Sequence, residues 1–379
     1  MKKKYLKRTV GIISMILVVT AYVWFMQENI TGLYNDSDCR NVKSFYLEEP
    51  DSLDMVVMGS SEIINGYLAS EAYREEGITS YPYACSINSV LLWEYELNEI
   101  ERTQHPKVLL IETNGALYEE EKYMKAHYGI DMVIDCMPLT LNKLKAALSL
   151  SDEPLERMIP FIKYHYKWAE MEDPEDNTMM MLNRQGHARL RGAMSQLFLK
   201  RIPLEGLKPH DMASADLDPL AEEALDGFLE KCKSSEIEHI VFIEYPHILN
   251  SDERYERHMR AKQAEKMIRE AGFDYIDLCA ASEEIGLDYR TDFNDEDHMV
   301  VPGQIKTTRY LAGIIRDRYI HEPKNLSEKS DAEWNESAEL IEKYCRLYDK
   351  YTAARDPYEN PHFKLIENRQ IMKELEEMD

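Results

Sequence analysis

Short apolar runs alternate with amphipathic stretches through the middle of the chain. Helical periodicity is predicted over residues 66–76, 91–101, 219–233 and 253–271, with a further helix from about residue 304. Between these helices, mostly apolar runs end in polar or glycine-containing loops and predict buried strands at residues 54–58, 78–83, 108–111, 240–243 and 275–278. This alternation is typical of an α/β fold with a central parallel sheet covered by helices on both faces, a three-layer α/β/α arrangement.

Two stretches break the alternation. Residues 119–218 contain three consecutive methionines (179–181) and amphipathic stretches such as 141–148. They are expected to form a helical insertion over the carboxyl edge of the sheet, which would shape a cleft, dock a partner or cap the domain. The charged C-terminal tail, residues 321–379, has helical patterns near 331–354 and 363–377. These predict amphipathic helices that are solvated or folded back on the domain.

The N-terminal segment predicts a membrane anchor. Residues 9–27 carry no charge, and a helix of this length spans roughly 28 Å, close to the hydrocarbon thickness of a bilayer. Basic residues precede the run and acidic residues follow it, which predicts a cytoplasmic N-terminus and an exported remainder. Residues 1–29 are therefore expected to be a cytoplasmic stub and transmembrane anchor, followed by a tether to about Glu49. The alternatives are a cleaved signal peptide, for which no small-residue cleavage site is present, and a buried core helix.

Composition narrows the classes of function. The 44% of apolar residues can form a sizeable core, and 70 acidic against 45 basic side chains give a formal net charge of −25. Because such a surface repels phosphate backbones, we expect no nucleic-acid partner. The six cysteines are scattered without a CxxC pair, so neither a zinc ribbon nor a thioredoxin-type site is expected. Neither GxGxxG nor GxxxxGK[ST] occurs, which agrees with chemistry that needs no nucleotide cofactor.

Candidate chemistry lies in the loops that follow the strands, because ligands bind at the carboxyl ends of strands in open α/β sheets. After the first strand, Gly-Ser-Ser at 59–61 can present the Ser61 hydroxyl at a helix start, although serines there also suit an N-cap. After the third strand, Asn114 can donate to an oxyanion or form a turn. In the last loop Asp295 precedes His298 by three residues and can orient its ring, unless the loop is an acidic surface loop.

The order of these residues resembles the SGNH/GDSL hydrolase superfamily, whose fold is flavodoxin-like. Gly-x-Ser after the first strand, Asn after the third and Asp-x-x-His after the last carry the resemblance. The stretch LDMVVMGSSEIINGYLASEAYREEGITSYPYACS is similar to exported bacterial members, including the DltD-like proteins of teichoic acid D-alanylation. The stretch DFNDEDHMVVPGQIKTTRYLAGII resembles their final block. The resemblance covers about residues 45–320, and implies an SGNH hydrolase-like domain there.

The resemblance implies a role for each of these residues. Ser61 would be the nucleophile, His298 the general base and Asp295 its orienting partner.

The same resemblance implies an oxyanion hole. Asn114 and the backbone N–H of Ser61 would donate to the oxyanion. A further contact, usually a glycine after the second strand, falls on Ile87 or Ala84. His165 is a candidate cleft residue, with a packed amphipathic helix as the alternative.

The implied activity is that of a membrane-anchored extracytoplasmic serine esterase or O-acyltransferase acting on acyl esters of cell-envelope glycopolymers. No metal or cofactor is implied. The bilayer, contacted through residues 9–27, and a membrane-bound O-acyltransferase are the expected partners. The alternative is a non-catalytic SGNH-fold envelope protein that partners such an acyltransferase, which the departure from glycine near Ile87 favours. A third interpretation, a lipolytic enzyme, is disfavoured by an acidic domain near anionic lipids.

Overall fold

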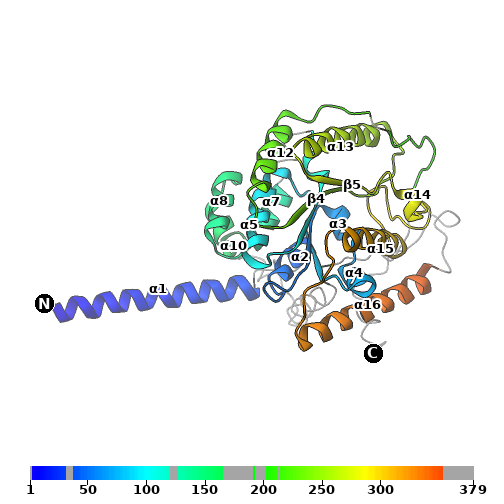
Figure 1. Cartoon of the computed structure of the whole chain (residues 1–379). Helices are drawn as coiled ribbons and strands as arrows, with labels where there is room; N and C mark the ends of the chain where they lie inside the picture. The colour runs from blue at the N-terminus through cyan, green and yellow to red at the C-terminus, as the bar shows by residue number, and fades with distance from the viewer. Residues whose placement is uncertain are drawn as a thin grey trace.

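A five-stranded parallel sheet lies at the centre of the molecule (Figure 1). The computed structural model describes residues 2–30, 37–119, 127–164, 191–192, 202–211 and 213–352. The strands are β1 Met55–Gly59, β2 Ser80–Ala84, β3 Val108–Glu112, β4 His239–Glu244 and β5 Asp274–Asp277. Each begins and ends within two residues of a predicted strand. The α/β class and the parallel sheet predicted from the sequence are confirmed.

The strand order β2-β1-β3-β4-β5 determines where loops converge. The chain runs outward from β1 to β2, then returns past β1 and continues in the opposite direction through β3, β4 and β5. In a doubly wound sheet of this order the connections diverge at the carboxyl ends of β1 and β3. The loops after these two strands are therefore placed to form a site.

Helices cover both faces of the sheet (Figure 1). Right-handed crossovers place the connections of the two directions on opposite faces. One face carries α5 Trp93–Thr103, α12 Pro219–Cys232 and α13 Asp252–Glu270. The other carries α4 Ala69–Glu76 and α15 Val301–Arg318. Strands β1, β2 and β3 are consequently buried along their whole length, which explains why the sequences of β1 and β3 are apolar runs rather than alternating patterns.

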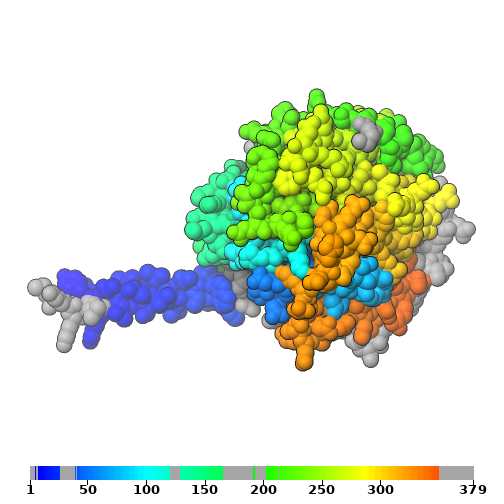
Figure 2. Space-filling model, in the orientation of Figure 1, coloured from blue at the N-terminus to red at the C-terminus, as the bar shows by residue number. Residues whose placement is uncertain are grey.

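The N-terminal helix α1, Lys2–Ile30, extends away from the sheet (Figures 1 and 2). Within it, Lys7–Phe25 is long and apolar enough to cross a membrane, and none of this stretch is buried against the rest of the protein. The expected tether after it is wrong in part, because α2, Ser37–Phe45, packs on the edge strand β2. Phe45 is fully buried, and the Asn41 amide donates to the carbonyls of Pro82 and Ala84.

Between residues 127 and 164 the insertion is mostly helical, as expected, whereas its other described segments, 191–192, 202–211 and 213–218, contain no helix. It contains α7 His127–Cys136, α8 Leu141–Leu150, α9 Pro154–Met158 and α10 Pro160–Tyr164. Helix α7 lies against the loop after β2, at the carboxyl edge as expected, whereas α8 packs beside α5. His165 and the three consecutive methionines lie outside the described residues.

The C-terminal tail folds back on the domain. Helix α16, Glu328–Thr352, packs against α4 and α15. Trp334 is fully buried, between the ring of Tyr73 at 5.2 Å and the guanidinium of Arg191 at 4.2 Å. Of the two alternatives for this helix, the folded-back one is therefore observed. The second expected tail helix, 363–377, lies outside the described residues.

Candidate active site

The two serines after β1 have different partners. Ser60 occupies the N-cap of the short helix α3, Ser61–Ile64, and its Oγ accepts the backbone N–H of Glu62 at 3.3 Å. Ser61 Oγ instead lies 2.9 Å from Nε2 of His298, 237 residues along the chain. The N-cap interpretation thus applies to Ser60, and the half-buried Ser61 hydroxyl faces an imidazole.

His298 lies between Ser61 and a carboxylate. Its Nδ1 lies 2.8 Å from Asp295 Oδ1. The pKa of Asp295 is lowered: burial acts to raise it, but the hydrogen bonds from the His298 ring and from two backbone N–H groups outweigh that effect. An ionised carboxylate only accepts hydrogen bonds, so Nδ1 carries the proton and Nε2 presents its lone pair to the Ser61 hydroxyl. The hydroxyl, imidazole and carboxylate therefore form one hydrogen-bonded chain.

Backbone contacts hold the loop that carries Asp295 and His298. The Asn294 N–H donates to the His298 carbonyl at 2.8 Å, and an antiparallel bridge joins Phe293 to Met299. Asp295 Oδ1 also accepts the backbone N–H groups of Asp297 at 3.1 Å and of His298 at 2.9 Å. This closed loop fixes the imidazole before any ligand arrives.

A glycine lets the next helix approach the loop. A Cβ on Gly303, in the first turn of α15, would lie 2.3 Å from the Asp292 carbonyl oxygen. Real Cβ atoms do not come this close, so any side chain here would push α15 away from the loop. The glycine that follows the Asp-x-x-His block thus has a packing role.

Asn114 reaches the loop after β1, as predicted. Its Nδ2 lies 3.2 Å from Ser60 Oγ and 3.1 Å from Glu62 Oε1. An amide nitrogen has two protons, and these two acceptors account for both of them. Donation from Asn114 to an oxyanion therefore requires that one of these bonds be exchanged.

The loop after β2 adopts a backbone conformation that glycine favours. Ile87 has φ +55°, in the left-handed region that costs a β-branched residue roughly 1–2 kcal/mol. Ala84, the other candidate position, ends β2. The left-handed conformation thus occurs at Ile87, where the sequence carries isoleucine instead of glycine.

A buried ion-pair network, which the sequence analysis missed, links the two loops. Glu62 forms an ion pair with Arg257 of α13, and Arg257 Nη1 lies 3.2 Å from Asp297 Oδ1. Burial raises the pKa of Glu62 despite the nearby guanidinium. Burial also acts to raise the pKa of Asp297, but Arg257 and Arg254 hold that pKa well below its usual range.

Glu112, the last residue of β3, fastens the backbone around the two serines. Its carboxylate accepts the N–H of Ser60 at 2.9 Å and of Asn114 at 2.6 Å. Burial raises its pKa although both hydrogen bonds oppose the shift. Its position at the end of a predicted strand was the available signal. Arg257 lies in a helix with no motif around it, and the sequence offers no comparable signal for it.

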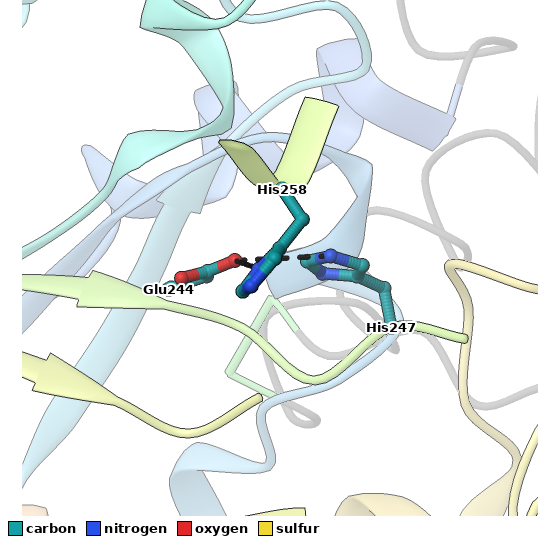
Figure 3. Close-up of side chains that lie close together, drawn as sticks. All are labelled: Glu244, His247 and His258. Carbon is teal, nitrogen blue, oxygen red and sulfur yellow. Dashed lines mark hydrogen bonds and ion pairs between the residues drawn. The ribbon is translucent and has the colours of Figure 1, made fainter. Parts of the chain in front are cut away.

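A second buried polar cluster lies at the ends of β4 and β5 (Figure 3). Glu244, His247 and His258 have ligand atoms that all lie within 4.8 Å of one another. The sequence predicted none of these residues: Glu244 and His247 lie at the end of β4 and in the loop after it, where no candidate was sought, and His258 lies in α13. Among the described residues, these three side chains form the group whose ligand atoms lie close enough together to hold a metal ion.

Comparison with known protein families, with curated protein sequences and with solved structures found no match. The resemblance to SGNH hydrolases therefore remains a prediction from the sequence. A proposed function therefore has to come from the geometry of the Ser61–His298–Asp295 chain.

Proposed function

We propose that this protein is a membrane-anchored, extracytoplasmic serine esterase or O-acyltransferase. The observation that carries the proposal is the hydrogen-bonded chain from Ser61 Oγ to His298 Nε2, 2.9 Å, and from His298 Nδ1 to Asp295 Oδ1, 2.8 Å. A serine hydroxyl is a weak nucleophile until a neighbouring base accepts its proton, and a carboxylate on the far nitrogen stabilises the imidazolium that results. Three residues brought together from two distant loops meet these requirements.

The proposed reaction has two steps. His298 Nε2 takes the Ser61 proton as Oγ attacks the carbonyl carbon of an ester. The tetrahedral intermediate collapses when the alcohol leaves with the proton from His298, and an acyl-serine remains. Water, in hydrolysis, or a hydroxyl of an acceptor, in transfer, then gives its proton to His298 and attacks the acyl carbon. Ser61 regains its proton when this second intermediate collapses.

Donors for the oxyanion are proposed from three loops. The backbone N–H of Ser61 and the Asn114 amide are the first two, and the backbone N–H of Ile87 is the third. Asn114 would exchange its bond to Ser60 or Glu62 for one to the oxyanion. A left-handed backbone at Ile87 is consistent with a loop shaped for close approach of a ligand.

Features of α1 and α8 support a location at the membrane surface. Helix α1 contacts α10, and α8 and α10 lie on the side of the domain from which α1 extends (Figure 1). Exposed leucines occur on this side at positions 139, 141, 148 and 155. Lipid or a membrane protein would cover such side chains favourably. The basic residues in the first turns of α1, before its apolar stretch, support a cytoplasmic N-terminus with the sheet outside.

The substrate class is inferred from location and resemblance together. Outside the membrane, acyl-CoA is absent, so a transferase would need a donor delivered across the bilayer. A membrane-bound O-acyltransferase would supply it, and an envelope glycopolymer would be the acceptor or the ester substrate. The acidic surface disfavours anionic lipid as the substrate.

Activity-based labelling tests the proposal. Full-length protein in detergent should react with a fluorophosphonate and hydrolyse short acetyl esters faster than long acyl esters. Ser61→Ala should abolish both activities, Ser60→Ala should retain labelling because Ser60 is an N-cap, and the surface variant Ser234→Ala should behave as wild type. A folded wild-type protein that neither labels nor hydrolyses any ester would contradict the proposal.

One observation favours a second candidate, a non-catalytic envelope protein that partners an acyltransferase. Both Asn114 amide protons are engaged with Ser60 and Glu62, so the oxyanion donor is not preformed. Labelling of the wild type separates the two candidates, and Asn114→Ala then tests the oxyanion donor of an enzyme. It should slow labelling of an enzyme by roughly 10²- to 10³-fold, the usual cost of one oxyanion donor. A non-catalytic protein would show no labelling for the substitution to slow.

A further inference from the structure

The buried cluster at the end of β4 has the composition of a transition-metal site (Figure 3). Glu244 is the last residue of β4, His247 follows in the loop and His258 reaches in from α13. Glu244 Oε1 lies 3.2 Å from His258 Nδ1 and 3.8 Å from His247 Nε2. In a tetrahedral zinc site, bonds of about 2.0–2.1 Å separate the ligand atoms by roughly 3.3 Å. The observed spacings are close to this value.

A cysteine beside the cluster would become the fourth ligand by turning its sulfur toward the ion, since that sulfur is not among the ligand atoms that lie within 4.8 Å of one another. Cys279 follows β5 by two residues and is fully buried. Its Sγ lies 3.8 Å from His247 Nε2. Sulfur bonds to zinc are longer, about 2.3 Å, so a wider separation from neighbouring ligands is expected. Carboxylate, two imidazoles and a thiol are ligand types that zinc accepts together.

The outer nitrogens of both histidines are already bonded to backbone carbonyls. His247 Nδ1 lies 3.0 Å from the Tyr245 carbonyl oxygen, and His258 Nε2 lies 3.2 Å from that of Asp211. A carbonyl only accepts, so each of these nitrogens carries a proton. Metal-binding histidines usually show this arrangement, which fixes the ring and directs the other nitrogen at the ion. Both inner nitrogens face the Glu244 carboxylate, so either a proton or a metal ion lies between each nitrogen and that carboxylate.

Partners outside the cluster also hold the other two side chains. Lys262 Nζ lies 3.2 Å from Glu244 Oε2, which leaves Oε1 directed at the histidines. Nδ1 of His210 lies 3.2 Å from Cys279 Sγ, close enough to donate to a thiolate. All four side chains therefore have an outer contact of the kind that orients metal ligands.

We propose that this cluster binds one zinc ion through four side chains: Glu244, His247, His258 and Cys279. Zinc replaces a proton between His258 and Glu244, and the Cys279 thiol gives its proton to solvent as the sulfur–zinc bond forms; no electron transfer is involved. Four protein ligands leave no open position, so the site is structural rather than catalytic.

The proposed ion would brace the neighbouring loops. It joins the ends of β4 and β5 to α13 and, through His210, to the segment before α12. The loop after β4 also bonds to the loop that carries His298, because the Ile248 N–H donates to the Glu296 carbonyl at 2.8 Å. The zinc site does not depend on the proposed esterase activity, since its ligands and its test are separate.

Metal binding to the full-length protein tests this inference. Protein purified in detergent and stripped with a chelator is titrated with zinc chloride, and bound metal is counted after gel filtration. We expect one zinc per chain and a higher melting temperature. His247→Ala and Cys279→Ser should each weaken binding by at least about 100-fold, beyond the usual effect of an outer-contact substitution. The matched controls His321→Ala, at an exposed histidine, and Cys345→Ser, on α16, should bind zinc as wild type.

Cobalt chloride provides a measurement that needs no variant. Cobalt in the wild-type site should give a thiolate-to-metal charge-transfer band and the intense visible bands of tetrahedral geometry, and the first should disappear in Cys279→Ser. The proposal is overturned if wild-type protein retains no zinc and its melting temperature is the same with and without zinc. It is also overturned if bound cobalt shows no thiolate-to-metal charge-transfer band. In that case the cluster is a metal-free network in which a proton joins His258 to Glu244.

Discussion

Replacing Asp295 with asparagine isolates the charge of the carboxylate from its geometry. One oxygen, Oδ1, accepts all three of the contacts described for this side chain: the His298 ring at 2.8 Å and the N–H groups of His298 at 2.9 Å and Asp297 at 3.1 Å. The carbonyl oxygen of an asparagine can occupy the same place. The loop and the imidazole should therefore keep their positions while the negative charge is lost.

The size of the effect follows from Coulomb's law. The imidazolium that forms during attack lies about 4 Å from the carboxylate charge, which is worth about 4 kcal/mol at an effective dielectric constant of 20. Both side chains are about a quarter exposed, 26% for His298 and 29% for Asp295, so solvent screening lowers this to about 2–4 kcal/mol. Since each 1.36 kcal/mol is tenfold in rate, we expect Asp295→Asn to slow the reaction of Ser61 by roughly 30- to 900-fold.

The rate constant for fluorophosphonate labelling measures this effect. Wild type, Asp295→Asn and Glu296→Gln are compared at neutral pH, after each is shown to melt at a similar temperature. Glu296 is in the same loop and carries the same charge, but its side chain contacts Arg254 and Asn250 rather than the imidazole. Glu296→Gln should label as wild type. If Asp295→Asn also labels within about threefold of wild type, the carboxylate does not support the imidazolium, and the reasoning is refuted.

Four further predictions concern stability and placement. Burial raises the pKa of Glu96 from 4.5, its value in the unfolded chain, to about 8. The protonated side chain therefore stabilises the fold at low pH, and this stability is lost as the pH rises from 4.5 to 8. Urea unfolding should show a loss of about 1.4 kcal/mol per pH unit from this residue, absent in Glu96→Gln and present in the exposed Glu94→Gln. At Ile87, glycine should be more stable than alanine by about 1 kcal/mol in thermal melts, because φ is +55°; equal stability would argue against the left-handed conformation. Trp334→Ala should weaken the packing of α16 on the domain by about 3–5 kcal/mol and make this helix sensitive to protease. An unchanged cleavage pattern would contradict the docking of α16. In liposomes, a fluorophore attached to the cysteine of Leu148→Cys should be quenched by nitroxide lipids more strongly than one attached to the cysteine of Lys329→Cys, on α16. The reverse order would contradict the proposed orientation of the domain.

The parts of the fold that the sequence predicted are those that depend on local patterns. Strands β1 and β3 are fully buried, so their sequences are continuous apolar runs that periodicity detects. Ser61 and His298 were found because a parallel sheet brings the carboxyl ends of its strands to one edge, which makes loop position informative. The tether was predicted wrongly in part because α2 is a short polar helix stabilised by packing on β2, and packing leaves little local signal.

The parts that were missed depend on contacts between distant residues. Arg257 pairs with Glu62 across 195 positions, and nothing in the sequence around either residue indicates the other. His258 lies in a helix rich in acidic and basic residues, so the sequence does not distinguish it from the exposed polar side chains around it. In the structure it is buried beside Glu244. Glu244 and His247 could have been found by examining the end of the fourth strand and the loop after it.

Peptide mapping of the fluorophosphonate adduct tests the central claim most directly. Full-length protein is labelled, digested and analysed by mass spectrometry to identify the modified residue. The alignment of hydroxyl, imidazole and carboxylate predicts a single adduct on Ser61, which is lost in His298→Ala although Ser61 is still present. An adduct on any other residue, or one on Ser61 that forms equally fast without the imidazole, would contradict the account.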